Sequence, residues 1–201
     1  MWIYEKRLQF PVKITATNPK YAQMLISQYG GPDGELSASM RYLAQRYTMP
    51  TKEVGGLLTD IGTEELAHME IICAMVYQLT RDMTLEDAKT AGFDAYYIDH
   101  TKGLWPQAAA GLPFNACEFQ SKGDALADIT ENLAAEQKAR VVYDNLLRMI
   151  PDPEVREPLK FLRTREIVHF QRFGEAMEQI KARLDSKNFY YFNPEFDRQF
   201  K

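Results

Sequence analysis

A glutamate and a histidine, three positions apart, interrupt an apolar helical stripe at two places in this sequence. A stripe with this period normally faces the core of a helical protein, where an unpaired carboxylate is strongly unfavourable. The folded chain must therefore bring partners to these side chains. The first stripe comprises Leu58, Ile61, Glu65, His68, Ile72, Met75 and Leu79, and the second comprises Leu159, Leu162, Glu166, His169, Phe173, Ala176 and Ile180.

A lone glutamate precedes each Glu-x-x-His pair by the same distance. Glu35 lies 30 residues before Glu65, and Glu136 lies 30 residues before Glu166. The turn signals "TMPTKE" and "PDPE" stand between the members of each pair. If the chain folds back at these turns, each carboxylate lies about 18 to 21 Å from its turn, at ~1.5 Å per residue. The spacing therefore predicts two helical hairpins, each with a lone Glu beside a Glu-x-x-His.

The turn signals divide the chain into helices and one long connection. No stretch alternates long enough to build a sheet, so we expect an all-α protein. The connection lacks a sustained period and is expected to run irregularly between the second and third bundle helices, over about 81–122. Helices are expected over about 19–29, 34–47, 52–80, 124–150 and 154–185.

Packed as a four-helix bundle, the two hairpins would converge four carboxylates and two imidazoles in the core. Such a set is stable only if cations neutralise it. Oxygen-rich ligands with one imidazole per metal suit iron or manganese. A Glu from each of two helices, with Glu-x-x-His from the other two, is the ferritin-like dimetal pattern. The residues that form it are Glu35, Glu65, His68, Glu136, Glu166 and His169.

Four other polar side chains near these motifs need an interpretation. Glu64 competes with Glu65 for the partnership with His68, but it lies off the stripe and is expected to be solvated. Tyr42 shares the face of its helix with Glu35, and it is either a contact of the site or an ordinary core tyrosine. The remaining two are Arg140, either a partner of the site or a salt bridge of the bundle, and His100, expected to form loop hydrogen bonds.

Composition excludes several classes of function. The 201 residues carry a net charge of −4 without a basic block, which argues against a nucleic-acid or anionic-membrane surface. No window reaches the roughly 18 apolar residues that span a bilayer, and the N-terminus lacks the apolar stretch of a signal peptide. Cys73 and Cys117 are too few for a disulfide framework or a thiolate metal site. We expect an intracellular protein without membrane or nucleic-acid partners.

The segments "KRLQF", "GGPDGELSASMRYL", "DIGTEELAHMEII" and "PDPEVREPLKFLRTREIVHFQRF" together resemble the manganese catalases. The similarity covers nearly the whole chain and is strongest to the short spore-coat members, the coat protein JC type of endospore-forming bacteria. It implies a ferritin-like four-helix bundle with two manganese ions per subunit that disproportionates hydrogen peroxide. It also implies a homo-oligomer, with a hexamer as one option, located in the spore coat with other coat proteins as partners.

The resemblance also implies a role for each site residue. Glu35, Glu65 and His68 would bind one manganese, Glu136 and His169 would bind the other, and Glu65 would bridge the two. Glu166 and Tyr42 would be the catalytic residues, Glu166 as a proton carrier outside the ligand set and Tyr42 as a hydrogen-bond partner of the first Glu. Two features depart from the family pattern: Ala135 stands where some members have Arg, and the chain ends soon after the fourth helix.

Two other functions fit the same residues. One is a di-iron oxidase or ferroxidase on this bundle, with iron in place of manganese. The other is a structural coat protein whose metal site is vestigial or stabilising. Metal analysis together with peroxide turnover separates these alternatives.

The sequence divides into a bundle domain with an N-terminal arm, residues 1–188, and an aromatic tail, residues 189–201. The tail holds six aromatic residues, which is too many for a freely solvated terminus. We expect it to dock on the bundle or on a neighbouring subunit.

Overall fold

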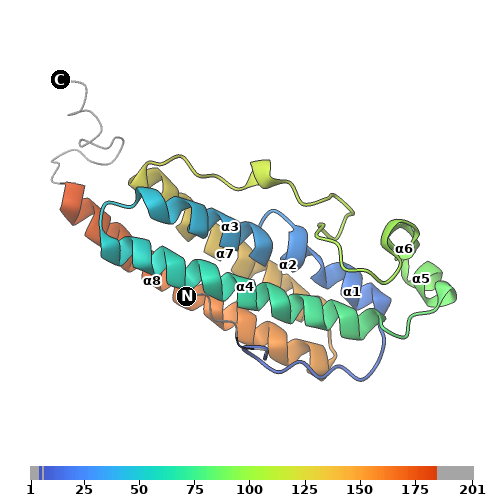
Figure 1. The fold of residues 1–201 in the computed structure, drawn as a ribbon. Coiled ribbons are helices and arrows are strands. Elements are labelled where there is room, and N and C mark those ends of the chain that lie inside the picture. Colours follow the sequence, from blue (N-terminus) through green and yellow to red (C-terminus); the bar gives the residue numbers. More distant parts are fainter. Residues whose placement is uncertain (1–4, 6, 185–201) are drawn as a thin grey trace.

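Four long helices form the bundle that the sequence predicts. The computed structural model describes residue 5 and residues 7–184. Helix α3 packs along α4, α7 packs along α8, and α4 also contacts α8 (Figure 1). Apart from one isolated bridge between Gln107 and Pro113, the described residues contain no β-structure, which confirms the all-α class. The bundle helices are α3 (Glu35–Gln45), α4 (Lys52–Thr80), α7 (Ala125–Met149) and α8 (Pro153–Leu184).

The N-terminal segment lies against the bundle. It is followed by α1 (Pro19–Leu25), which packs against α4, and α2 (Ser27–Gly30), where the sequence predicted one helix over 19–29. The division is slight because Ile26, between them, keeps right-handed helical angles. The residues before α1 are tied to α4 through Gln78, whose amide accepts from Ile14 N at 2.7 Å and donates to Val12 O at 3.0 Å.

The connection between α4 and α7 contains short helices that the sequence analysis missed. They are α5 (Leu85–Ala91), α6 (Asp94–His100) and the single turn η2 (Ala116–Glu118). Thr84 and Asp87 form a reciprocal capping box that starts α5, and Gly92, with φ of 72°, ends it. Helices this short cannot show a sustained apolar period, so periodicity did not reveal them.

The four-helix bundle holds two apolar clusters with a polar layer between them, and a third, smaller cluster packs α5 and α6 against Ile26. On α4, Ile61 and Ile72 belong to different clusters, and Glu65 and His68 lie between them. On α8, Leu162 and Phe173 belong to different clusters, and Glu166 and His169 lie between them. Members of one cluster are Ile72, Met75, Tyr143, Leu159 and Leu162, and members of the other are Tyr42, Leu58, Ile61, Phe173 and Ala176.

Gly62 allows α3 and α4 to approach closely beside this layer. A Cβ atom there would lie 2.9 Å from the side chain of Leu43, which is too close. The hydroxyl of Ser39 donates to the carbonyl of Gly62 at 2.7 Å and fastens the contact. The glycine therefore lowers the intrinsic stability of α4 but improves its packing.

No helix in the described part of the chain is long and apolar enough to cross a bilayer. The predicted boundary at residue 188 and the aromatic tail fall outside the described residues. Docking of the tail therefore stays a prediction.

Candidate metal centre

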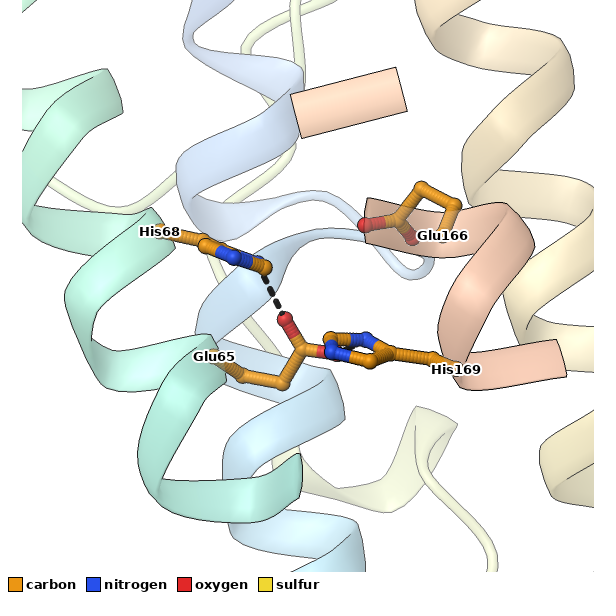
Figure 2. A group of neighbouring side chains, drawn as sticks. All are labelled: Glu65, His68, Glu166 and His169. Carbon is orange, nitrogen blue, oxygen red and sulfur yellow. Dashed lines mark hydrogen bonds and ion pairs between the residues drawn. The ribbon is translucent and has the colours of Figure 1, made fainter. Parts of the chain in front are cut away.

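The carboxylate of Glu65 lies between two imidazole rings (Figure 2). Its Oε2 is 2.7 Å from Nδ1 of His68, one turn further along α4. Its Oε1 is 2.8 Å from Nδ1 of His169, which α8 contributes. The two rings are nearly parallel, with an interplanar angle of 20° and centroids 5.5 Å apart. One carboxylate thus faces one histidine from each hairpin, an arrangement suited to bridging two cations.

Each histidine also faces the lone glutamate of its own hairpin. His68 Nδ1 lies 3.8 Å from Glu35 Oε2, and His169 Nδ1 lies 3.6 Å from Glu136 Oε2. All four side chains are buried. The hairpin geometry predicted from equal spacing is therefore present, and it produces two similar half-sites that share Glu65.

Glu166 lies in the same cluster, on α8 (Figure 2). With Glu65, His68 and His169 it offers ligand atoms that all lie within 4.8 Å of one another. Its Oε1 has no hydrogen-bond partner among the described residues. Glu166 also lines a small cavity that reaches the cluster between α3 and α7. The side chain is therefore buried and close to the centre.

Two buried tyrosines link the lone glutamates across the bundle. The hydroxyl of Tyr42 on α3 donates to Glu136 on α7, and the hydroxyl of Tyr143 on α7 donates to Glu35 on α3. The resemblance placed Tyr42 on the first glutamate, Glu35, and the structure corrects this: Tyr143 holds that position. The sequence carried a signal for it, because Tyr143 follows Glu136 by seven residues, as Tyr42 follows Glu35.

Glu64 is not solvated as expected. Its side chain is 17% exposed, and its Oε2 lies 3.0 Å from Nε2 of His169 while its Oε1 lies 3.6 Å from Nε2 of His68. Arg165 binds both oxygens, at 2.7 and 3.1 Å, and Gln9 donates to Oε1 at 2.7 Å. Glu64 therefore contacts the outer nitrogens of both rings and leaves each Nδ1 turned to the centre. Its position four residues before His68 was the available signal.

The other two polar side chains lie outside the centre. Arg140 pairs with Asp144 at 2.6 Å and donates to Gln137, so it is a salt bridge of the bundle. His100 ends α6, where its ring stacks on that of Trp105 with centroids 5.0 Å apart. Of the two roles expected for Arg140, a partner of the site or a salt bridge of the bundle, the structure shows the salt bridge.

Burial sets the protonation of the carboxylates in this cluster. It raises the pKa of Glu35 to about 7, with a further contribution from the charge of Glu65. It likewise raises the pKa of Glu136 and of Glu166. Burial also disfavours the charge of Glu65, but the two adjacent imidazoles outweigh it and lower the pKa of that group. Without a cation, protons balance these charges, and a bound metal has to displace them.

Several buried polar atoms of the cluster have no hydrogen-bond partner among the described residues. In folded proteins such atoms usually contact an ion or an ordered water. Carboxylate oxygens with one imidazole on each side suit iron or manganese, so the residues present fit a metal centre of this type. Those that face the centre are Glu65 Oε1, Glu136 Oε2, Glu166 Oε1 and His169 Nδ1, and of these Glu65 Oε1 and His169 Nδ1 lie 2.8 Å apart without the alignment of a hydrogen bond.

Comparison with known proteins identifies the family. The model for manganese containing catalase matches residues 1–199. The chain belongs to the manganese catalase family. This membership confirms the resemblance and the expected enzyme class, and it makes manganese the metal that the buried Glu/His cluster implies.

Individual relatives agree with this family. Protein CotJC of Bacillus subtilis (strain 168) is 53% identical over 190 residues, covering 94% of this chain and 100% of that protein. A probable manganese catalase of Clostridium acetobutylicum is 37% identical, covering 94% of this chain and 85% of its own length. The crystal structure of KatB, a manganese catalase from Anabaena, matches with a TM-score of 0.84 at 29% identity. That match covers 96% of this chain and 87% of KatB, and it confirms the ferritin-like bundle.

Ala135, where some manganese catalases carry Arg, lies in the wall of the cavity beside the cluster. The side chain is buried, and it precedes Glu136 on α7. A methyl group at this position leaves space in the cavity that a longer side chain would fill. The departure from the family pattern thus lies where a small molecule can approach the carboxylates.

Proposed function

We propose that this protein disproportionates hydrogen peroxide to water and oxygen at a centre of two manganese ions per chain. The observation that carries the proposal is the position of Glu65 between His68 and His169, each beside the lone glutamate of its hairpin. In a member of the manganese catalase family, this arrangement fits two equivalent cation sites with one shared carboxylate.

The reaction is two two-electron steps. One peroxide is reduced to two waters, which takes up two electrons and two protons, and a second is oxidised to dioxygen, which returns them. A bound pair of manganese ions, each changing by one electron, would supply this two-electron capacity. In the proposed ligand set, Glu35, Glu65 and His68 would hold one ion, and Glu136, Glu65 and His169 would hold the other.

Glu166 is proposed to move the protons between the two steps. A general acid–base must lie close to the reacting oxygen and be held in place. Glu166 is buried and lines the cavity that reaches the cluster, and its Oε1 accepts no hydrogen bond from the described residues. Tyr42 and Tyr143 hold Glu136 and Glu35 in place through their hydroxyl groups.

We further propose that the chain works as a homo-oligomer in the spore coat, with a hexamer as one option and other coat proteins as partners. The support is the resemblance to spore-coat members of the family and the 53% identity to Protein CotJC over the whole of that protein.

The direct test is oxygen evolution from peroxide by full-length protein of known metal content. Protein is expressed with manganese, with iron, or with both, and the metal per chain is measured on the sample used for turnover. We expect two manganese ions per chain and turnover that scales with manganese. Preferential loading and activity with iron would favour the oxidase or ferroxidase, and full loading without turnover would favour a structural role.

A further inference from the structure

Arg41 is a buried cation without a partner in the described part of the chain. It lies on α3 and is 2% exposed, and its Nε is a buried donor with no hydrogen-bond partner among the described residues. An unpaired charge in a protein interior is strongly unfavourable, and an arginine presents five N–H donors that need acceptors. Among the described residues, the surrounding side chains do not provide the hydrogen-bond acceptor that the guanidinium needs, so a bound ligand would have to provide it.

The surroundings of Arg41 leave room for such a ligand. Arg41 lines the cavity between α3 and α7, whose volume of about 10 Å³ admits about one water molecule. Three alanines in its wall keep the space open: Ala38, Ala135 and Ala139. A ligand there has to be small, of one or two non-hydrogen atoms.

The start of α3 adds hydrogen-bond donors at the same place. Gly34 and Glu35 line the cavity, and Gly34 is the N-cap residue of this 11-residue helix without a side-chain cap. The first backbone N–H groups of a helix point out of it and favour negative charge. Arg41 and the uncapped first turn thus approach one cavity from the same helix.

The acidic groups of the cavity do not oppose an anion once the metal centre is loaded. Glu35 and Glu136 belong to the proposed ligand set, so bound cations neutralise them. Asp33, at the rim, already pairs with Lys138 at 3.3 Å. Glu166, the one remaining carboxylate of the wall, belongs to the same cluster, with ligand atoms within 4.8 Å of those of Glu65, His68 and His169, so the charge of bound cations would offset its own.

We propose that Arg41 and the first turn of α3 form a binding site for a small monovalent anion, and that the anion binds when the metal centre is loaded. The ligand chemistry is that of a halide or of the hydroperoxide anion, one or two non-hydrogen atoms that accept hydrogen bonds from the guanidinium. The second ligand rests on the proposed catalase activity, whereas the first rests only on the proposed metal centre.

Bromide tests the site without any turnover. Crystals of the manganese-loaded, full-length protein are soaked in bromide, and anomalous scattering locates the ion. We expect bromide at the Arg41 guanidinium, its loss in Arg41→Gln, and its retention in Arg172→Gln, which removes the same charge from an exposed position on α8. Bromide that never enters the cavity, or that persists there in Arg41→Gln, overturns the proposal.

A solution measurement guards against a variant that fails to fold. Bromide should raise the melting temperature of the loaded wild type more than sulfate of equal ionic strength does, because sulfate is too large for the cavity. Arg41→Lys keeps the charge and should keep the bromide effect, whereas Arg41→Gln should bind bromide roughly ten- to a hundredfold more weakly. Equal effects of bromide and sulfate on the wild type would contradict the site.

Peroxide kinetics identify the natural ligand of the site. Bromide competition with peroxide and a raised KM in Arg41→Gln would assign the site to the substrate. An unchanged KM with loss of bromide would assign it to a halide. A protein without any turnover that still binds bromide at Arg41 would refute the catalase proposal and leave the anion site intact.

Discussion

The hydroxyl of Tyr143 on α7 donates a hydrogen bond to the carboxylate of Glu35 on α3. Tyr42 makes the reverse connection, from α3 to Glu136 on α7. Each lone glutamate is thus held by the tyrosine of the other hairpin. These two crossed hydrogen bonds join α3 and α7, which contribute one carboxylate each. The distance between the two carboxylates therefore depends on both hairpins.

Tyr143→Phe should weaken manganese binding by about 10- to 100-fold, the usual effect of removing a hydrogen bond to a metal ligand. It should also lower the free energy of unfolding by roughly 1.5–3 kcal/mol, because a buried carboxylate loses a partner. Tyr42→Phe should do the same through Glu136. Calorimetric manganese titration and denaturant unfolding measure both effects, and exposed Tyr77→Phe on α4 is the control. Unchanged affinity in both buried variants would contradict the role of the crossed bonds.

Glu65→Gln should strip most of the manganese, because both proposed cations lose a bond and a neutralising charge. The metal-free protein should also unfold more easily, by about 3–5 kcal/mol, since two histidines lose their buried carboxylate partner. Asp60→Asn, an exposed position on the same helix, makes the same chemical change away from the cluster. Metal analysis and denaturant unfolding compare the two variants. Equal losses in both would show that Glu65 is no ligand.

Glu166→Gln separates the proton carrier from the ligands. The amide keeps the shape of the side chain but cannot exchange the proton, so turnover should fall by roughly 10²–10⁴. Manganese content should stay close to that of the wild type and of Glu175→Gln, an exposed control on α8. Metal content and oxygen evolution are measured on the same sample. Loss of manganese as complete as in Glu65→Gln would place Glu166 among the ligands, as in a symmetric di-iron site.

Glu64→Ala should lower manganese affinity about 10- to 100-fold, because the outer nitrogen of His169 loses its hydrogen-bond partner at 3.0 Å and that of His68 loses a carboxylate at 3.6 Å. The loss of Glu64 also leaves Arg165 and Gln9 without their shared partner. Glu64→Gln, which keeps one acceptor oxygen, should restore part of the affinity. Calorimetric titration with manganese measures the series. Wild-type affinity in Glu64→Ala would show that the contacts to the rings have no effect on the ligands.

The metal-free protein should lose stability as the pH rises from about 5 to about 8. Burial raises the pKa of Glu35 from 4.5 to about 7. Burial alone would lower the pKa of His68 and His169, but the charge of Glu65 outweighs it and raises both above 6.5. A group with a raised folded-state pKa stabilises below its unfolded pKa, and this contribution is lost as the pH rises toward the folded value. The pKa of Glu65 is lowered, so its stabilising contribution is already complete above about pH 5 and is lost only at lower pH. It therefore does not offset the loss between pH 5 and 8.

Manganese should reverse the sign of this pH dependence. Its ligands bind only when deprotonated, so the loaded protein gains stability over the same range. Melting temperatures measured across the range, with and without manganese, check both slopes. A metal-free protein that becomes more stable between these pH values would contradict the protonation assigned to the cluster.

Helical periodicity placed most of the cluster from the sequence. Glu65 and His68 share a face because three residues make almost one helical turn, and the equal spacing of 30 residues puts the lone glutamates at the same height. The ends of the long helices followed from turn and cap residues such as Thr51, whose side chain accepts from Val54 N. These properties depend on the local chain, so the sequence alone determined them.

The partners of the cluster were decided only by tertiary structure. Periodicity gives the face of a residue on its own helix, but it does not say which neighbouring helix covers that face. Glu64 lies off the apolar stripe, yet α8 and the N-terminal arm cover it and supply Arg165 and Gln9. Which tyrosine reaches which glutamate, and the place of Arg41 in the wall of the cavity, likewise depend on how α3 and α7 are rotated against each other. That rotation is fixed by side-chain packing between helices, which no spacing along one helix reveals.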